Sequence, residues 1–266
     1  MSDDENKILK SLPLAEYSKL LPYLETVDLK PGEIIQQAGF SVEHVYFPRT
    51  ALFTGRTMFR NGSGIESGVI GAEGIIGADH WRQPDNAIRQ VLALTPGTCL
   101  RIKANYFRRL CHNLTSLREF VQNYLQAFNE QAVQLGACNS CHPLQMRLAR
   151  MLLLCSIDNY ISLTQETAAD LLGAHRPSVT RQAHYFKNKS LITYCRGRML
   201  ITDRQGLEAE ACECYESIKQ VYSTYYAELS VGRSSQQSRS DADVVFDYRT
   251  TRLPAKVSAG KITGLS

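Results

Sequence analysis

The chain has 266 residues, of which 44% are hydrophobic and 21% charged, so its composition is that of a globular protein. This composition excludes a disordered chain, a collagen-like repeat and a coiled-coil rod. No apolar run approaches the roughly 18 residues that span a bilayer. The polar start at 1–5 is followed by no apolar signal segment, so we expect a cytoplasmic protein whose eight cysteines are mostly reduced.

Positive charge is concentrated in one part of the chain. Between His142 and Arg204 there are nine Lys/Arg and four Asp/Glu, an excess of five, whereas the whole chain has a net charge of only +4. A local basic surface is typical of nucleic-acid binding, although a solvated face would have the same composition.

The N-terminal part predicts a short helix and then strands. The helix is expected over Leu12–Leu24, interrupted at Pro22. Short β-favouring segments with Gly and Pro turns between them predict a sandwich or barrel. These segments are Val27–Leu29, Ile34–Gln36, His44–Phe47, Leu52–Met58, Ile65–Ile70, Val91–Leu94 and Cys99–Ile102.

A long helix is predicted next, because apolar residues recur at steps of three and four. They are Leu114, Leu117, Val121, Tyr124, Phe128 and Leu135. Such a stripe is typical either of an amphipathic helix on its own core or of a dimer helix with a partner's copy against it.

Residues 161–204 predict two helices joined by a tight turn, followed by a hairpin. Thr164 suits a helix N-cap, Gly173 suits the left-handed residue that ends that helix, and Pro177 suits the first turn of the next. Ile192–Cys195 and Arg198–Ile201 flank a tight turn and predict a β-hairpin wing with a basic tip.

The second helix of this pair has the residues of a DNA reader. An α-helix fits the major groove, and an arginine there can donate two hydrogen bonds to guanine. Arg176 and Arg181 are the candidates for base contacts, with Ser178 and Thr180 as hydroxyl donors. The alternative is a structural helical hairpin whose arginines are only solvated.

The chain resembles the Crp/Fnr-type bacterial transcription regulators over about residues 14–229. The resemblance rests on Ile161–Tyr215 and on the segments Pro31–Ile35, Val42–Pro48 and Val69–Gly77. It implies an α+β protein with a cyclic-nucleotide-binding-like β-roll (jelly roll), a long dimerisation helix and a C-terminal winged helix-turn-helix. The expected divisions are 1–110 for the effector domain, 111–138 for the dimer helix, 139–229 for the DNA-binding domain and 230–266 for a disordered tail.

The resemblance also implies partners and contacts. A homodimer would read a pseudo-palindromic site in double-stranded DNA, and many relatives contact RNA polymerase. Pro177 stands where the cyclic-AMP receptor has an acidic residue that reads cytosine, so the operator sequence is left open. The predicted DNA contacts are Thr164, Gln165, Arg176, Ser178, Thr180, Arg181, Lys187, Lys189, Arg196 and Arg198.

The effector is expected not to be classical cyclic AMP. Relatives that bind it have a Gly-Glu pair and an Arg-Ser or Arg-Thr pair, whereas this chain has Gly77-Ala78 and, near the second position, Asp85-Asn86. An aspartate repels a phosphate. The predicted pocket residues, for an unknown small effector, are Gly77, Ala78, Arg82, Asn86 and Arg89.

The cysteines predict no metal site and no cofactor. Cys138–His142 spells C-x-x-C-H, but covalent haem belongs to exported proteins; a thiol-based redox or metal response at Cys138 and Cys141 is the open alternative. Cys212 and Cys214 would lie on different faces of a helix, which disfavours a joint metal site.

No catalytic motif is present, so the chain is not expected to be an enzyme. A metal-dependent jelly-roll enzyme is the least favoured function, because the strand region offers only His44 and His80 as histidine ligands. The competing function is a small-molecule or thiol-redox sensor that acts through protein partners, with a degenerate DNA reader.

Overall fold

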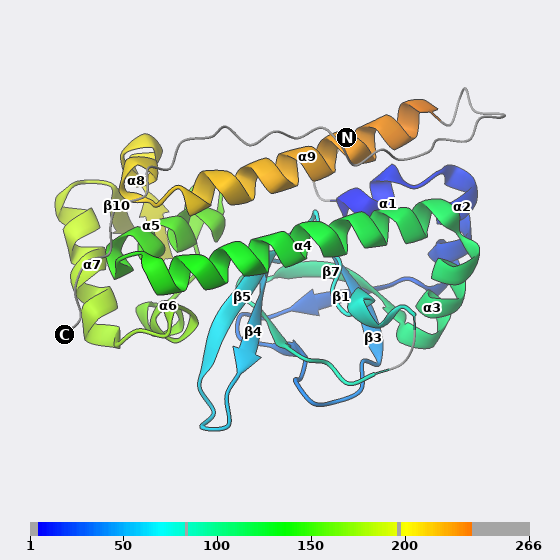
Figure 1. The fold of residues 1–266 in the computed structure, drawn as a ribbon, viewed down its shortest axis with the longest axis horizontal. Helices are drawn as coiled ribbons and strands as arrows, with labels where there is room; N and C mark the ends of the chain where they lie inside the picture. The colour runs from blue at the N-terminus through cyan, green and yellow to red at the C-terminus, as the bar shows by residue number, and fades with distance from the viewer. Residues whose placement is uncertain (1–4, 83–84, 196–197, 236–266) are drawn as a thin grey trace, which may run out of the picture.

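The N-terminal half of the computed structural model is an antiparallel β-roll with helices at one end (Figure 1). The structure describes residues 5–82, 85–195 and 198–235. The strands of the roll are β1 (Glu25–Leu29), β2 (Ile34–Gln36), β3 (His44–Pro48), β4 (Phe53–Met58), β5 (Gly64–Ile70), β6 (Gln90–Ala93) and β7 (Gly97–Lys103). They form two sheets, in the orders β1-β7-β3 and β2-β6-β4-β5. Phe47, Phe53 and Ile102 fill the core of the roll.

The helices before the first strand differ from the prediction. Instead of one helix over Leu12–Leu24, the chain forms α1 (Lys7–Ser11), α2 (Leu14–Leu20) and a 3-10 turn η1 (Leu21–Tyr23). Pro13 separates α1 from α2 because its ring restricts the residue before it to extended backbone. Within the roll, a second 3-10 turn, η2 (Ala78–His80), follows Gly77, whose φ is +82°.

Two helices follow the roll where a single one was expected. These are α3 (Ala104–Asn113) and α4 (Thr115–Cys141), and Leu114 between them is extended. The helix α4 lies on the β-roll (Figure 1), and the apolar stripe along it is buried. Gln131 extends that buried face, because its side-chain amide accepts from and donates to the backbone of Val69 in β5.

The C-terminal part is the winged helix-turn-helix that the sequence predicts. Its elements are α5 (Leu144–Leu154), β8 (Ser156–Ile157), β9 (Tyr160–Ile161), α6 (Gln165–Leu172), α7 (Arg176–Asn188), β10 (Ile192–Cys195), β11 (Arg198–Ile201), α8 (Arg204–Glu210) and α9 (Cys214–Ser235). The sheet order is β10-β11-β9-β8. Leu52, Val69 and Leu94 of the roll belong to the hydrophobic core of this part, so the two halves pack directly on each other.

The last helix, α9, returns to the N-terminal half. It lies antiparallel to α4, and three contacts along its length show this: Cys214 meets Gln134, Tyr222 meets Gln131, and Tyr225 packs on Tyr124 (Figure 1). The predicted tail boundary is therefore wrong at its start, because 230–235 are helical. The rest of the predicted tail, 236–266, lies outside the described residues.

Candidate nucleic-acid interface

The helix-turn-helix is built from local signals. The Thr164 hydroxyl accepts from the Thr167 amide at 3.0 Å and caps α6. Gly173 ends α6 with φ +58°, in the left-handed region that costs glycine little. Pro177 lies in the first turn of α7, where its missing N–H leaves no helical hydrogen bond unmade.

One face of α7 is buried and the other is open to solvent. Val179, Ala183 and Phe186 are buried in the C-terminal core. At 100° per residue, Arg181 falls on the opposite side of the helix from these three, and its side chain is exposed. Among the residues that the structure describes, none makes a hydrogen bond or ion pair with Arg181. Its guanidinium is therefore available to a ligand.

Arg176, the first residue of α7, is also exposed. Its only ion pair within the described ranges is with Glu166 of α6, at 4.0 Å, and the two side chains are 66% and 71% exposed. An exposed pair of this kind contributes about 0–1 kcal/mol, so the Arg176 guanidinium can leave it for a stronger partner. Ser178, two residues further along α7, is half-buried.

Gln165 and Thr180, both predicted to contact DNA, bind each other. The Thr180 hydroxyl donates to Gln165 Oε1 at 2.7 Å, and Gln165 Nε2 donates to the Tyr194 hydroxyl, also at 2.7 Å. This chain of hydrogen bonds joins α6, α7 and the wing strand β10. It ties the two helices to the wing, and no local pattern in the sequence indicates this role for Tyr194.

The predicted phosphate-binding residues differ in how free they are. The Lys187 ammonium lies 5.9 Å from the centre of the Tyr194 ring and is exposed. Lys189 instead donates to Glu210 Oε1 at 2.6 Å, and this hydrogen bond raises the pKa of its ammonium. Arg198 begins β11, and Arg196 lies outside the described residues.

Only two of the five predicted effector-pocket residues, Gly77 and Arg89, line the cavity between the roll and α4. The Arg89 guanidinium pairs with Asp79 at 2.6 Å and lies 4.6 Å from the centre of the Phe128 ring. The space left is about 10 Å³, room for about one water. The other three predicted residues lie elsewhere: Ala78 is buried in η2, Arg82 stacks on Trp81, and Asn86 accepts from Ser41.

The predicted dimer stripe on α4 faces the wrong way for a partner. Its six members are buried within their own chain, at 4% exposure or less: Leu114, Leu117, Val121, Tyr124, Phe128 and Leu135. The apolar period was correct, but the β-roll and α9 bury these side chains. A partner helix must therefore use the exposed side of α4, where Val133 is 66% exposed and Gly136 has open space above it.

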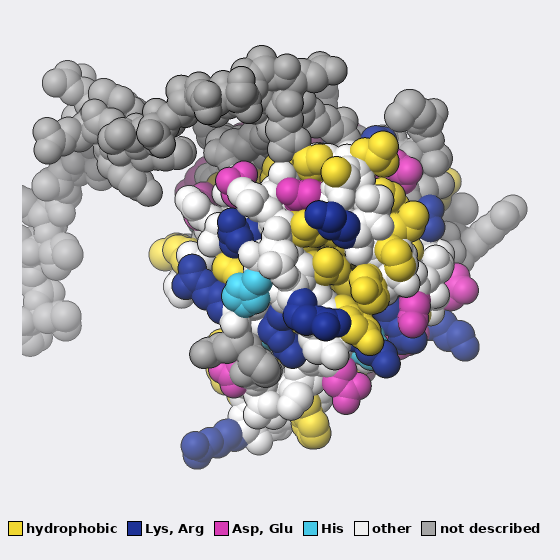
Figure 2. All heavy atoms as spheres, turned by 90° about the vertical axis from the view of Figure 1, so that its right-hand side faces the viewer, with side chains coloured by type: hydrophobic (Ala, Val, Ile, Leu, Met, Phe, Trp, Pro, Cys, Tyr) yellow, Lys and Arg dark blue, Asp and Glu magenta, His cyan; other side chains and the backbone are white. Residues whose placement is uncertain are grey.

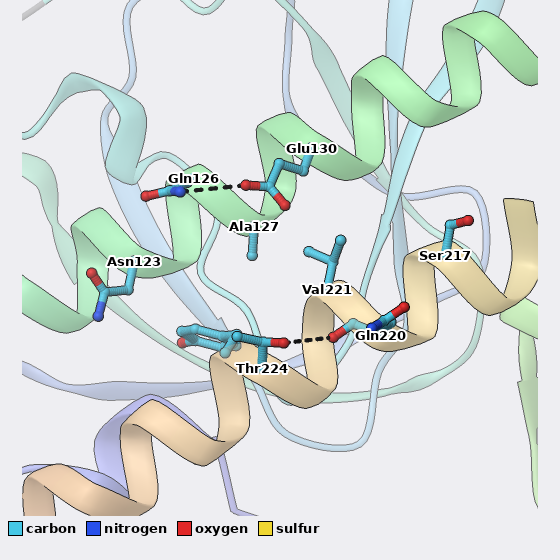
Figure 3. Close-up of a pocket in the computed structure, with 9 residues that line it drawn as sticks. Asn123, Gln126, Ala127, Glu130, Ser217, Gln220, Val221 and Thr224 are labelled. Atoms are coloured by element: carbon cyan, nitrogen blue, oxygen red, sulfur yellow. Dashed lines mark hydrogen bonds between the residues drawn. The ribbon is translucent and has the colours of Figure 1, made fainter. Parts of the chain in front are cut away.

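A shallow groove of about 260 Å³ separates this exposed side of α4 from α9 (Figure 3). Its rims are polar: Gln126 and Glu130, hydrogen-bonded to each other at 3.3 Å, stand on α4, and Gln220 and Thr224 stand on α9. The groove runs between two helices and holds none of the predicted effector residues.

Apolar and basic side chains also gather at the end of the molecule that carries α1, α2 and α3 (Figure 2). A groove of about 540 Å³ lies there, and the exposed Leu14 and Leu21 line it. Since α7 lies at the other end of the molecule, this groove is separate from the helix-turn-helix (Figure 1).

Residues 146–210 match the Crp-like helix-turn-helix domain. Over 206 residues the chain is 27% identical to the HTH-type transcriptional regulator Cmr of Mycobacterium tuberculosis. This alignment covers 74% of the chain and 80% of Cmr. The chain therefore contains a Crp-like helix-turn-helix domain and is similar to Crp/Fnr-type transcription regulators. The structure supports this assignment through its fold and its helix-turn-helix.

Solved structures of this type share the fold. A Crp/Fnr regulator from Eubacterium rectale superposes with a TM-score of 0.61 at 21% identity, over 77% of this chain and 98% of its own. FixK2 from Bradyrhizobium japonicum also gives 0.61, at 12% identity, over 71% of this chain and 98% of its own. Within the described part of the chain, no helix has the length and apolar character to cross a membrane.

Proposed function

We propose that the chain binds double-stranded DNA sequence-specifically as a homodimer, with α7 in the major groove and Arg176 and Arg181 reading base edges. The observation that carries this proposal is the exposure of Arg181 near the start of α7, opposite a face that Val179, Ala183 and Phe186 bury. Helix-turn-helix proteins read bases mainly from the first part of their second helix.

The remaining predicted contacts divide by chemistry. Lys187 is exposed and suits the phosphate backbone, as do Arg196 and Arg198 of the wing, which follow from the sequence. Lys189 contributes less, because Glu210 already neutralises it. The amide of Gln165 and the hydroxyls of Thr164 and Thr180 act by orienting α6 and α7.

The exposed side of α4 supports the homodimer. Exposed residues follow one another there at steps of three and four, as on any helix face, and Val133 is the one apolar side chain among the seven. They are Glu119, Gln122, Gln126, Asn129, Val133, Gly136 and Ser140. The small side chains toward the end of α4 allow two copies of the helix to approach closely. A twofold dimer then presents two reading helices to half-sites about 34 Å apart, one turn of DNA.

The effector cavity supports a ligand other than classical cyclic AMP. Arg89 is the one arginine among the residues that line this cavity. Its guanidinium is already paired with Asp79, and the Phe128 ring lies beside it. A cyclic phosphate bound here would have to displace the Asp79 carboxylate and would be repelled by it. Contact with RNA polymerase, which the resemblance implies, stays a prediction.

Selection from a pool of random DNA duplexes tests this function. We expect the full-length protein to enrich a pseudo-palindromic sequence whose half-sites are one helical turn apart. The Arg109→Ala variant is the matched control, since Arg109 is an exposed arginine on α3, far from α7, and it should enrich the same sequence (Figure 1). A pool that shows no preferred sequence would favour a sensor that acts through protein partners.

A further inference from the structure

Three cysteines and one histidine meet where the DNA-binding part joins α4. Cys138 and His142 come from the last turn and the C-cap of α4, and Cys212 and Cys214 come from the connection between α8 and α9. Their ligand atoms, three Sγ and one imidazole nitrogen, all lie within 4.8 Å of one another. The three cysteines are buried and the histidine is half-buried.

This arrangement overturns the argument that Cys212 and Cys214 point apart. That argument holds only if both residues lie within one helix. In the structure α8 ends at Glu210, Ala211 is extended, and α9 begins at Cys214. Cys212 therefore lies outside the helix, and the turn directs both sulfurs toward the end of α4.

The spacing of the ligand atoms is close to that of a tetrahedral metal site. Cys138 Sγ lies 3.4 Å from Cys212 Sγ, and Cys214 Sγ lies 3.5 Å from His142 Nδ1. With Zn–S near 2.3 Å and Zn–N near 2.0–2.1 Å, a regular tetrahedron has S···S edges of about 3.8 Å and S···N edges of about 3.6 Å. These two edges need to change by only a few tenths of an ångström, and the other ligand atoms, all within 4.8 Å of one another, need to approach by at most about 1 Å to hold one ion.

The surrounding groups are those that orient metal ligands. Nε2 of His142 lies 3.2 Å from the Glu213 carboxylate, which leaves Nδ1 as the nitrogen directed at the cysteines. A carboxylate behind a histidine ligand fixes its tautomer and strengthens it as a donor. Gln134 Nε2 donates to Cys214 Sγ at 3.0 Å. A sulfur that accepts a hydrogen bond suits a thiolate.

We propose that Cys138, His142, Cys212 and Cys214 bind one zinc ion. Three thiolates and an imidazole are a ligand set that zinc prefers, and four protein ligands leave no open position, which is the pattern of a structural site. The three thiolates and the ion together carry one negative charge. The guanidinium of Arg147, close enough to interact electrostatically with Cys138 and Cys212, compensates it.

A disulfide explains less of this geometry. It would join Cys138 to Cys212 and leave the contact between Cys214 and His142 without a role. The predicted thiol pair of Cys138 and Cys141 is not brought together either, because Cys138 is buried and Cys141 is exposed. Zinc uses all four clustered side chains and excludes the exposed cysteine.

The position of the site gives the ion a structural task. The chain passes from α4 into α5 directly after His142, and α9 begins at Cys214. An ion bound by both segments fixes the start of α9 against the end of α4, at the junction between the dimer helix and the DNA-binding part. Its binding free energy then adds to the stability of that junction.

Metal content of the full-length protein, purified under reducing conditions and dialysed against zinc, tests the proposal. We expect one zinc per chain by elemental analysis, and Co²⁺ in its place should give the absorption of tetrahedral thiolate coordination. Cys212→Ser should lose the metal, whereas Cys141→Ser, the matched control, should retain one ion per chain. Circular dichroism establishes that Cys212→Ser is folded.

A variant that keeps all four ligands separates a metal site from a loss of fold. Glu213→Gln removes only the carboxylate behind His142, and we expect zinc affinity to fall about 10- to 100-fold with one ion still bound at saturation. Removing zinc from the wild type with a chelator should speed hydrogen exchange at the start of α9. Wild-type protein with substoichiometric zinc, or with a Cys138–Cys212 disulfide in its place, would overturn the proposal.

Discussion

A buried ion pair joins the two halves of the molecule, and removing one member should destabilise the fold strongly. Arg150 of α5 lies 3.5 Å from Glu66 of β5, and the two side chains are 0% and 1% exposed. A buried charge that loses its partner costs about 3–5 kcal/mol. We therefore expect Arg150→Met, which leaves the buried Glu66 carboxylate without its guanidinium, to lower the free energy of unfolding by about that amount. At about 2–4 °C per kcal/mol, the melting temperature should fall by about 6–20 °C.

Replacing both charges separates the pair from simple loss of packing. The double variant with Glu66→Leu and Arg150→Met removes the charges together, so its stability should equal or exceed that of the wild type, because two ions need no longer be buried. Glu25→Gln is the matched control: it breaks an exposed pair with Arg101 and should cost at most about 1 kcal/mol. Denaturant unfolding measures all three. A single variant as stable as the wild type, or a double variant as unstable as the single, would refute this reasoning.

The same pair predicts a pH dependence. Burial raises the pKa of the Glu66 carboxyl, and the neighbouring Arg150 opposes that rise. A carboxyl whose pKa is higher in the folded than in the unfolded state destabilises the fold when it ionises. This loss of stability is absent below the pKa of the unfolded state, and it grows as the pH rises toward the pKa of the folded state. Relative to the double variant, the wild type should therefore lose stability across that interval.

Three further changes test other parts of the structure. Val133→Asp should convert the proposed dimer to monomer in sedimentation experiments, while Leu14→Asp, at a still more exposed leucine on α2, should not; dimers of both variants would exclude this face of α4. Gly173→Ala should cost about 1–2 kcal/mol in thermal unfolding, because φ is +58° there, and an unchanged melting temperature would contradict the strain. Lys187→Ala should reduce the slope of log affinity for DNA against log salt concentration by about one, whereas Lys189→Ala should change this slope less because Glu210 already pairs with Lys189. A larger change of slope for Lys189→Ala than for Lys187→Ala would contradict the pairing of Lys189.

The sequence predicts best what neighbouring residues decide. The wing strands Ile192–Cys195 and Arg198–Ile201 and the helix Gln165–Leu172 are observed with the predicted bounds, because a cap, a glycine and a tight turn define them locally. The resemblance to Crp/Fnr-type regulators supplied the order of the larger units, and the observed fold has that order.

Contacts between distant segments could not be predicted in this way. The period along α4 shows that one face is apolar, but not whether the chain's own sheets or a partner bury it. The return of α9 decided that question and also brought Cys212 to Cys138. Likewise, nothing near Arg150 in the sequence indicates that Glu66 lies beside it, because the two residues belong to different halves of the chain.

Base reading by Arg181 can be measured through the affinity of the Arg181→Ala variant for two duplexes. One duplex carries the selected site and the other a scrambled sequence of the same length, both at one salt concentration, with Arg109→Ala as the control. If Arg181 reads bases, the variant should lose about 1–3 kcal/mol on the selected site and change little on the scrambled one. Equal losses on both duplexes would contradict base reading by Arg181.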